Sequence, residues 1–358
     1  MGFLLVSDII KMAQKQLEEA GVEDVKGDAE ALYCYLKHVD RARFFLSWAN
    51  PADDRTCEGY FNLVARRCKR EPLQLIIGEQ EFMGIPIKTK KGVLIPRLDT
   101  EVVAMAAELL LKEQKNKTVL DLCCGSGALG IALAKRAEAK VTFADISESA
   151  ISLTKENIAA TGVKGAEVVW GDLYDPVAKK KFGMIVSNPP YIETSVIPTL
   201  MPEVRQWEPM SALNGGADGL DFYRRIIAGA PAHLKKGGTL VLEIGHDQAY
   251  AVTEMLEQSP AFAEIKVIKD LAHNDRVVTA LYDEKAAKRE AKRLAEEEKQ
   301  AAKAAKLAEK EAKKAARRGE PVPAADEAPA ADEAIPEEAA AAAEAAPQTD
   351  AAAGNEGE

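Results

Sequence analysis

The sequence lacks the features that mark membrane, secreted and metal-binding proteins. No hydrophobic run approaches the roughly 18 consecutive apolar residues of a membrane span, and the start of the chain, Met1–Val6, carries no basic leader. Its 5 cysteines show no metal-ligand spacing, because Cys123 and Cys124 are adjacent, and it has only 4 histidines. We therefore expect a cytoplasmic protein with reduced cysteines, no membrane association and no metal site.

The sequence also lacks a uniform positive charge. Its 358 residues have a formal net charge of −10, and residues 1–284 alone have −6. Residues 285–318 carry 13 basic and 6 acidic side chains, whereas residues 319–358 carry 11 acidic side chains and no basic ones. The acidic main part of the chain has no general attraction for polyphosphate. Any contact with RNA or the ribosome is therefore expected to be weak and to involve residues 285–318.

What the sequence does contain is a regular alternation of strand and helix patterns between residues 118 and 282. Short apolar runs predict the strands, and apolar residues at helical spacing predict the helices. Such alternation is typical of an α/β protein with a parallel sheet covered on both faces. The last two strands have no helix between them, which predicts an antiparallel pair that closes the sheet. The expected strands are 119–122, 140–144, 166–170, 183–187, 239–244, 264–269 and 276–282, and the expected helices are 129–136, 149–161, 219–233 and 248–258.

The residues before and after this region predict three further kinds of structure. Apolar residues at helical spacing indicate three N-terminal helices, of which the first is capped by Ser7 and has Gly21 just past its end. Short extended runs from Leu73 to Thr89 predict a β-hairpin. After Asp283, Ala, Lys, Glu and Arg predict a solvated helix, and the acid-rich residues beyond it cannot bury enough surface to fold. The expected segments are a helical domain 1–72, a hairpin connector 73–92, an α/β domain 93–283, a charged helix 284–318 and a disordered acidic tail 319–358.

A glycine-rich loop follows the first expected strand of the α/β domain. Gly125 and Gly127 allow the backbone to approach a ligand and to turn into the next helix. Asp145 ends the next strand, where an acid can bind both hydroxyls of a ribose, and Asp172 ends the third strand, where it can accept from an adenine amine. The three-glycine pattern of dinucleotide sites is only partly met, and a phosphate-loop lysine is missing. The loop therefore predicts a nucleoside without phosphates, such as S-adenosyl-methionine. The expected cofactor-binding residues are Cys123, Cys124, Gly125, Ser126, Gly127, Asp145, Asp172, Leu173 and Asn188.

Four residues after the fourth expected strand carry the predicted chemistry. Asn188, Pro189, Pro190 and Tyr191 follow the apolar run 184–186, at the strand end where open α/β sheets place their sites. The two prolines stiffen the loop and remove two backbone donors. The Asn188 carboxamide and the Pro189 carbonyl can together accept both hydrogens of an NH₂ group. The tetrapeptide therefore predicts a site that orients a planar amine or amide.

Several longer stretches of the chain are sequence motifs specific enough to identify a protein family. They are Ser187–Ile192, Pro202–Arg205 with Glu208–Pro209, Leu213–Arg224, Leu94–Arg97, Glu243–Gly245 with Gln248, and Lys269–Asp270 with Asp275–Val278. Together with the two loops they resemble the protein-(glutamine-N5) methyltransferase family, which modifies peptide chain release factors, over residues 5–282. The resemblance implies a Rossmann-like, S-adenosyl-methionine-dependent methyltransferase domain behind a small helical substrate-binding domain.

The resemblance also implies a substrate, which is the glutamine in the Gly-Gly-Gln tip of a translation release factor. Asn188 and Pro189 would hold its amide nitrogen in line with the methyl–sulfonium bond, and Tyr191 would pack on the amide plane. We expect the enzyme to act as a monomer and without a dedicated base. The expected catalytic residues are Asn188, Pro189 and Tyr191, and the expected substrate-binding residues are Asn188, Pro189, Pro190, Tyr191 and Arg97.

The chain departs from the family pattern at two positions and in its tail. Cys123 stands where the family often has Gly, and Leu98 replaces a common Pro after Arg97. Residues from Glu284 onward match nothing in the family. Neither substitution touches Asn188, so the departures leave the predicted chemistry in place.

Two other functions compete with this interpretation. A nucleic-acid amino methyltransferase of the adenine N6 type meets the same geometric problem after flipping its base and uses the same tetrapeptide. Such an enzyme is expected to have a basic face, whereas residues 1–284 have a net charge of −6. A degenerate adaptor domain is expected to lose its cofactor acids, but Asp145 and Asp172 are present.

Overall fold

The computed structural model describes residues 4–115 and 117–318. The chain forms two compact units, Met1–Leu294 and Ala295–Glu358. All the strands described belong to the first unit. The tail 319–358, expected to be disordered, lies outside the described residues.

The chain begins with helices that pack around one apolar core. Ile9, Leu17 and Leu32 are completely buried there, together with aromatic residues that contact each other edge to face. Their repeats of three and four residues turn one stripe of each helix inward. The helices are α1 (Val6–Glu19), α2 (Val25–Lys37), α3 (Arg41–Leu46), α4 (Asp54–Cys68) and α5 (Leu73–Ile77).

Two local predictions in this region are wrong. Ser7 does not cap α1, because the helix already begins at Val6 with Leu5 as its N-cap, and Ser7 is buried in the first turn. Leu5 forms a bridge with Pro51, which fixes the start of the helix two residues earlier than the capping pattern predicts. The start of the expected hairpin is also helical. Leu73–Ile77 form α5, since Ile76 packs into the helical core and Gly78 ends the helix with φ +89°.

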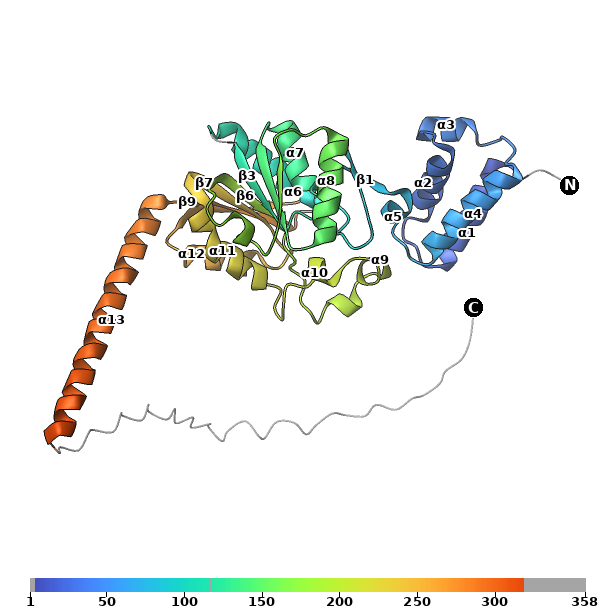
Figure 1. The fold of residues 1–358 in the computed structure, drawn as a ribbon. Helices are drawn as coiled ribbons and strands as arrows, with labels where there is room; N and C mark the ends of the chain where they lie inside the picture. The colour runs from blue at the N-terminus through green and yellow to red at the C-terminus, as the bar shows by residue number, and fades with distance from the viewer. Residues whose placement is uncertain (1–3, 116, 319–358) are drawn as a thin grey trace, which may run out of the picture. The chain divides into compact units, whose positions relative to one another are not determined.

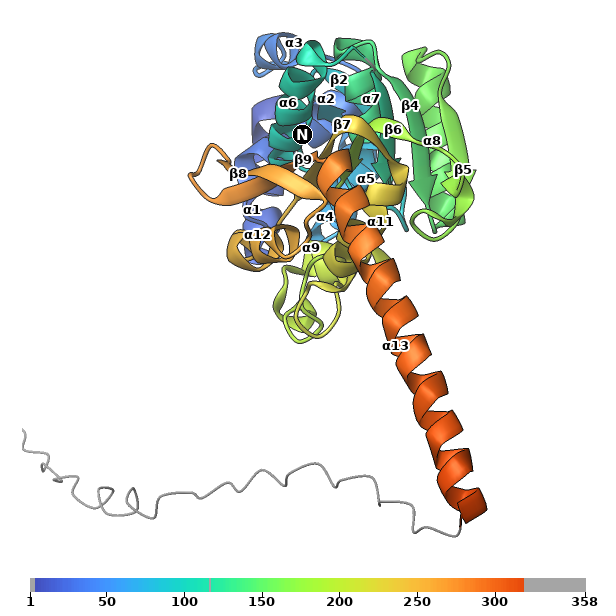
Figure 2. The same ribbon diagram turned by 90° about the vertical axis from the view of Figure 1, so that its left-hand side faces the viewer.

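The hairpin itself and a larger sheet follow α5. The hairpin pairs β1 (Glu79–Phe82) with β2 (Ile85–Lys88) in antiparallel register. The larger sheet has seven strands in the order β5-β4-β3-β6-β7-β9-β8 (Figures 1 and 2). Five strands pair in parallel, and β9 pairs antiparallel with both β7 and β8. The pairing of β8 with β9 is the antiparallel pair that the sequence predicts. The strands are β3 (Thr118–Leu122), β4 (Lys140–Asp145), β5 (Glu167–Trp170), β6 (Phe182–Ser187), β7 (Leu234–Glu243), β8 (Phe262–Lys269) and β9 (Asp275–Tyr282).

Helices cover both faces of this sheet, which confirms the α/β fold. Neighbouring residues of one strand enter different cores: Val119 packs on one face and Leu120 on the other, as alternation along a strand requires. One face is covered by α6 (Leu98–Glu113) and α7 (Ala128–Arg136), and the other by α11 (Asp221–His233) and α12 (Ala249–Glu257) (Figures 1 and 2). Helix α8 (Glu148–Thr161) packs beside β4, β5 and the hairpin strand β2. Helices α3 and α6 are additional to the expected helices.

A long segment, residues 192–220, which we name the excursion, leads away from the sheet between β6 and α11. It contains the short helices η2 (Ile197–Thr199), α9 (Pro202–Arg205) and α10 (Met210–Leu213), and another short helix, η1 (Asp175–Val177), precedes β6. Glu203 of α9 accepts hydrogen bonds from Arg67 at 2.8 Å and from Arg70 at 2.6 Å. These ion pairs connect the excursion, which carries part of the site below, to the N-terminal helices.

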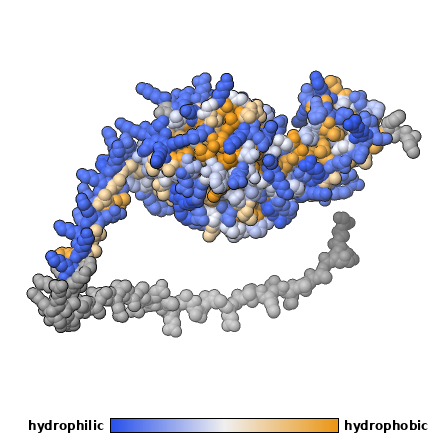
Figure 3. Space-filling view, in the orientation of Figure 1, coloured by the Kyte–Doolittle hydropathy of each residue, from blue (hydrophilic) through white to orange (hydrophobic). Residues whose placement is uncertain are grey.

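The last described helix, α13 (Glu284–Arg318), begins on the first unit. Asp283 accepts hydrogen bonds from the backbone of Lys285 and Ala286, and Ala287 packs against the core beneath α11 and α12. Farther along, its surface is mostly hydrophilic with scattered apolar patches (Figure 3), and Leu294 and Leu307 are its exposed large apolar side chains. Among residues 4–115 and 117–318, none of the helices combines the length and apolar character required for a membrane span.

Candidate active site

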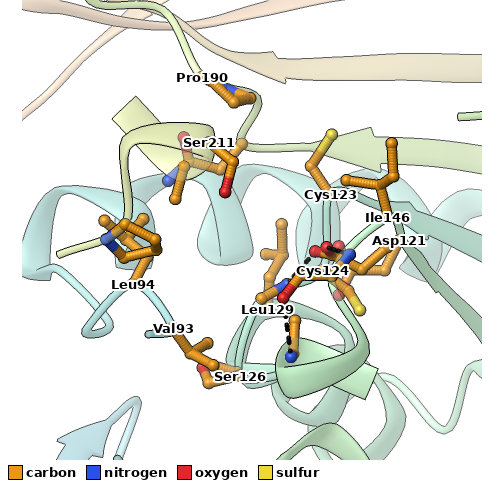
Figure 4. Close-up of a pocket in the computed structure, with 18 of the residues that line it drawn as sticks. Val93, Leu94, Asp121, Cys123, Cys124, Ser126, Leu129, Ile146, Pro190 and Ser211 are labelled. Atoms are coloured by element: carbon orange, nitrogen blue, oxygen red, sulfur yellow. Dashed lines mark hydrogen bonds between the residues drawn. The ribbon is translucent and has the colours of Figure 1, made fainter. Parts of the chain in front are cut away.

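A pocket lies at the carboxyl ends of β3, β4 and β6, where parallel sheets place their ligands. Cys123 and Ile146 lie on one side of it, opposite Leu94 and Ser211 (Figure 4). The structure thus brings together eight of the nine expected cofactor-binding residues. Gly127 is the exception, because it lies behind the lining as the N-cap of α7. The eight are Cys123, Cys124, Gly125, Ser126, Asp145, Asp172, Leu173 and Asn188.

The backbone of residues 123–127, which we name the cofactor loop, has an unusual conformation. Gly125 and Gly127 have φ of +55° and +80°, which glycine adopts without a steric penalty. Cys123 has φ +57° although it carries a side chain, so the departure from the family's glycine falls on a position where the backbone favours glycine. The Gly127 N–H donates to the Cys124 carbonyl at 2.7 Å and closes the turn into α7.

Helix α8 supports the cofactor loop from behind. The Thr154 hydroxyl donates to the Gly125 carbonyl at 2.9 Å, and the Asn157 amide donates to the Ser126 carbonyl at 2.9 Å. Asn157 is fully buried and also exchanges hydrogen bonds with both backbone groups of Lys88 in β2. One side chain therefore joins the loop to the hairpin.

Asp145 both holds the cofactor loop and lines the pocket. Its two carboxylate oxygens accept from the backbone N–H groups of Gly125 at 2.9 Å and Ser147 at 2.8 Å. Burial raises the pKa of Asp145, and these backbone hydrogen bonds partly lower it. Each oxygen retains a further lone pair, so the carboxylate is able to accept from two ribose hydroxyls.

Asp172 lines the same pocket from the end of β5. One of its oxygens forms an ion pair with Arg225 of α11, a partner that the sequence patterns do not indicate. The other oxygen is left to accept from a ligand amine. The following residue, Leu173, is buried with φ +43° and adds an apolar surface to the pocket wall.

A second pocket adjoins the first on the side of the excursion. Pro189, Tyr191 and Glu243 line only the second pocket, whereas Pro190 lines only the first. Asn188 and Arg97 line both. The expected catalytic residues are thus gathered at one place, and Asn188 lies in the wall between the two pockets.

Residues far apart in the sequence hold the second pocket's loop, residues 188–191, which we name the amide loop. The Asn188 amide donates to the Thr100 hydroxyl at 3.1 Å, and the Tyr191 hydroxyl donates to Glu243 at 3.2 Å. Gln248 donates to the Tyr191 carbonyl at 2.9 Å. The Asn188 oxygen is therefore the end of the carboxamide that is left to accept from a substrate.

Glu243 is a buried acid at the end of β7, with 1% of its surface exposed. Burial raises its pKa to about 7, while the Thr100 hydroxyl, the Arg276 guanidinium and the Tyr191 hydroxyl lower it. Among the described residues, its Oε2 atom has no hydrogen-bond partner. Glu243 thus brings a buried carboxyl group with a raised pKa to the lining of the second pocket.

Arg97, like Asn188, lies between the two pockets and lines both of them. Its guanidinium pairs with Glu208 of the excursion, whose other oxygen accepts from the Ile95 N–H at 3.2 Å. Burial raises the pKa of Glu208, and the Arg97 charge lowers it. Arg97 therefore holds the excursion against the site as well as lining it.

Sequence reasoning missed several residues of this site. Asp121 carries a detectable signal, because an acid inside an apolar strand requires a partner; it accepts from the Gly130 N–H at 2.9 Å, and burial raises its pKa to about 8. Thr100 lies in α6, which the helix patterns did not include. Glu243 and Glu208 fall within the specific stretches, but spacing alone assigns them no role. The missed residues are Thr100, Asp121, Asn157, Glu208, Arg225 and Glu243.

Comparison with known proteins gives two family matches. Residues 8–78 match the family described as PrmC N-terminal domain, and residues 86–201 match the Methyltransferase small domain. A release factor glutamine methyltransferase of Geobacter sulfurreducens is 39% identical over 274 residues, which are 76% of this chain and 95% of that protein. Proteins with the same description from Thermodesulfovibrio yellowstonii and Clostridium acetobutylicum are 40% and 38% identical, over 70% and 77% of this chain and 90% and 98% of theirs.

Proposed function

We infer the function from a premise that these relatives establish: the chain belongs to the release factor glutamine methyltransferase family. We propose that it transfers a methyl group from S-adenosyl-methionine to the side-chain amide nitrogen (N5) of the glutamine in the Gly-Gly-Gln motif of peptide chain release factors. The observation that carries this proposal is the position of Asn188 in the wall between two adjoining pockets.

The first pocket fits S-adenosyl-methionine. Asp145 has lone pairs for two ribose hydroxyls, Asp172 has a free oxygen for an adenine amine, and Ile146 and Leu173 offer apolar surface to a purine. The bound cofactor supplies an electrophilic methyl group on a sulfonium. The chain's own residues have to hold the cofactor and exclude other orientations.

The amide loop has a more demanding task, because the nitrogen lone pair of a carboxamide is delocalised into its carbonyl. The Asn188 oxygen and the Pro189 carbonyl accept the two amide hydrogens, which concentrates electron density on nitrogen and fixes its direction. Tyr191 borders the same pocket and packs against the planar amide. As the nitrogen bonds to the methyl carbon, the methyl–sulfonium bond would break and leave the cofactor as a neutral thioether, and the proton that the nitrogen then loses would pass to water.

The excursion and the N-terminal helices complete the surface that a protein substrate meets. Glu203 links the two through Arg67 and Arg70, and Arg97 links the excursion to the pocket wall. We propose that a release factor docks across these parts and inserts its glutamine into the second pocket. We further propose a cytoplasmic monomer, consistent with five free cysteines, with weak ribosome or RNA contact through residues 285–318.

Mass spectrometry of a release factor incubated with the purified chain and methyl-deuterated S-adenosyl-methionine tests the proposal. We expect one labelled methyl group on the glutamine of the Gly-Gly-Gln peptide. A release factor with Ala in place of that glutamine is the matched control and should remain unlabelled. Label on adenine of added nucleic acid, with none on the release factor, would contradict the proposal and favour an amino methyltransferase of nucleic acids.

A further inference from the structure

The orientation of one carboxamide decides whether the proposed site works. Asn188 accepts a substrate hydrogen only when its oxygen faces the pocket, and a half-turn of the carboxamide would present an NH₂ group instead. Two N–H donors facing each other cannot bond. The site therefore requires a device that keeps the Asn188 nitrogen turned away from the substrate.

Thr100 is the group that holds the Asn188 nitrogen. Its hydroxyl accepts from Asn188 Nδ2 at 3.1 Å, and Thr100 is buried on the first turn of α6. A hydroxyl can either donate to Asn188 or accept from it, so this contact alone does not fix the carboxamide. Whatever receives the single Thr100 proton makes that choice.

Glu243 stands at the end of β7, which packs against α6, and the Thr100 hydroxyl is among the groups that lower its pKa, so Glu243 is suited to receive that proton. An ionised carboxylate only accepts hydrogen bonds, and the Tyr191 hydroxyl already donates to one of its oxygens at 3.2 Å. Its Oε2 has no partner among the described residues. We propose, on the basis of the function above, that ionised Glu243 takes the Thr100 hydroxyl proton as a hydrogen bond, so that Thr100 accepts from Asn188 Nδ2 and the Asn188 oxygen faces the substrate. Thr100 and Glu243 are then positioning residues.

Protonation of Glu243 reverses this arrangement. A neutral carboxyl group donates to Thr100, whose own proton then turns toward Asn188 and favours its oxygen, so the NH₂ group swings into the pocket. The charged and titratable groups around Glu243 are Asp99 of α6, Arg276 of β9, Tyr191 of the amide loop and Tyr223 of α11. Because the pKa of Glu243 is raised to about 7, the balance between the two states shifts near neutral pH.

Three variants test the chain of contacts, with kcat and KM measured from pH 5.5 to 9. In the wild type, kcat should rise with pH and level off above about 7, since only ionised Glu243 orients Asn188. Thr100→Val should lower the plateau about tenfold, the equivalent of one hydrogen bond, and remove this rise. Thr100→Ser should restore most of the rate and the rise. Thr253→Val makes the same substitution on α12, where the lost hydroxyl donates to the Ala249 carbonyl; it is the matched control and should behave as wild type.

Affinity for S-adenosyl-methionine separates positioning from a general loss of structure. Calorimetry should give unchanged affinity in Glu243→Gln, because Glu243 lines only the second pocket, and no more than a few-fold change in Thr100→Val, because Thr100 also borders the first. A Thr100→Val enzyme with the wild-type plateau, or with the same rise through neutral pH, would overturn the proposal.

A readout without turnover keeps this test separate from the identity of the substrate. With ¹⁵N-asparagine labelling, the Asn188 amide protons should show nuclear Overhauser contacts to Thr100 at pH 8.5 and lose them at pH 5.5. Contacts that are the same at both pH values would refute the orientation mechanism, even in an enzyme that methylates release factor. If the contacts change with pH but release factor is not methylated, the orientation mechanism stands and the proposed function fails.

Discussion

The cofactor loop and the amide loop lie at the same edge of the sheet but are held in different ways. The cofactor loop depends on its own backbone, in which Cys123, Gly125 and Gly127 have positive φ. Further support comes from Asp145 at the end of the next strand, and from Thr154 and Asn157 on the helix that follows it. Short stretches of sequence therefore contain nearly everything that shapes this loop.

The amide loop depends instead on side chains from distant elements. Asn188 is held by Thr100, 88 residues earlier, and Tyr191 by Glu243, 52 residues later. Gln248 of the α12 N-terminus completes the support. The part of the site that binds a nucleoside is thus locally encoded, whereas the part that orients the reacting amide exists only after the sheet and α6 have assembled.

The largest expected effect comes from Asn188→Ala, which breaks the amide loop and spares the cofactor loop. Deleting an acceptor aimed at the reacting nitrogen should raise the barrier by about 2 to 4 kcal/mol, a rate loss of roughly 30- to 1,000-fold, by analogy with oxyanion donors. Single-turnover kinetics give the loss, and calorimetry should show a much smaller loss of affinity for S-adenosyl-methionine, because Asn188 is only one of the residues that line the cofactor pocket. Turnover within a few-fold of wild type would remove Asn188 from the reaction.

Asp145→Ala should have the opposite effect: it disrupts the cofactor loop and leaves the amide loop intact. The carboxylate is expected to hold two ribose hydroxyls, and each charge-assisted hydrogen bond contributes roughly 1.5 to 3 kcal/mol. It also accepts from the Gly125 N–H, so its loss loosens the cofactor loop. Calorimetry should show much weaker binding of S-adenosyl-methionine, while kcat at saturating cofactor falls less than in Asn188→Ala. Equal affinity in wild type and variant would show that the loop binds something else.

Gly127→Ala tests how far the cofactor loop relies on backbone conformation. Gly127 has φ +80°, and an added Cβ would lie 2.9 Å from Thr154 Cγ2. Positive φ in a residue with a side chain costs about 1 to 3 kcal/mol, and the clash adds to that cost. Gly162→Ala is the matched control, since Gly162 has φ +72° and nothing within 4 Å of the added atom.

The difference between these two glycine variants in urea unfolding measures the clash alone. We expect Gly127→Ala to be the less stable of the two and to bind S-adenosyl-methionine more weakly. Equal stability would mean that Thr154 moves aside freely and that the loop is less tightly supported than its contacts indicate.

The same contrast explains which features the sequence predicts. The β3 and β6 strands, the glycine-rich loop and Asp145 follow from apolar runs and neighbouring turn residues, which act over a few positions. Ser7 fails as a cap because pairing of Leu5 with Pro51 starts α1 earlier. Leu73–Ile77 fails as a strand because burial of Ile76 in the helical core favours α5. In both cases tertiary contact overrides a local preference.

The positioning residues could not be predicted for a related reason. The role of Thr100 depends on the packing of α6 against β7, the strand that ends at Glu243, and no spacing in the chain relates the two residues. Asp121 is different, because an acid in an apolar strand already indicates a buried partner. Its role in holding Gly130 was therefore within reach of sequence reasoning, whereas the role of Thr100 was not.

Stability should fall as pH rises, because each loop has one buried acid beneath it. Burial raises the pKa of Asp121 to about 8 and that of Glu243 to about 7. In the folded state these two carboxyl groups keep their protons at pH values where the unfolded chain, with carboxyl pKa values of about 4, has already released them. Between about pH 4 and pH 8, the free energy of unfolding is therefore greatest at pH 4 and declines as the pH rises. Each proton contributes at most about 1.4 kcal/mol per pH unit.

Urea unfolding of the Asp121→Asn variant from pH 5 to 8 measures how much of this decline in stability comes from Asp121, the buried acid next to the cofactor loop. The amide oxygen still accepts from the Gly130 N–H, so the variant should fold and show a shallower slope than wild type. Asp175→Asn, at an exposed position, is the control and should keep the wild-type slope. A slope unaffected by Asp121→Asn would mean that this carboxyl is ionised in the folded protein at every pH tested.

The smallest effect is expected from shortening α13, which supports neither loop. Ending the chain after Leu294 leaves the first unit entire, and its stability and methyl transfer to purified release factor should match the full chain. Ending it after Glu284 also removes Ala287, which packs against the core, so stability should fall by no more than about 1 kcal/mol, in proportion to one small apolar group. Urea unfolding and methylation assays measure both quantities.

Ribosome co-sedimentation shows whether the removed residues have another use. Residues 285–318 carry 13 basic and 6 acidic side chains, and basic clusters bind phosphate without regard to sequence. If they tether the enzyme to ribosomal RNA, the full chain should sediment with ribosomes at low salt and be released at moderate salt, while both shortened chains stay in solution. Residues 285–318 lie outside both pockets, so a large loss of methyl transfer without ribosomes would contradict this picture and place α13 within the catalytic fold.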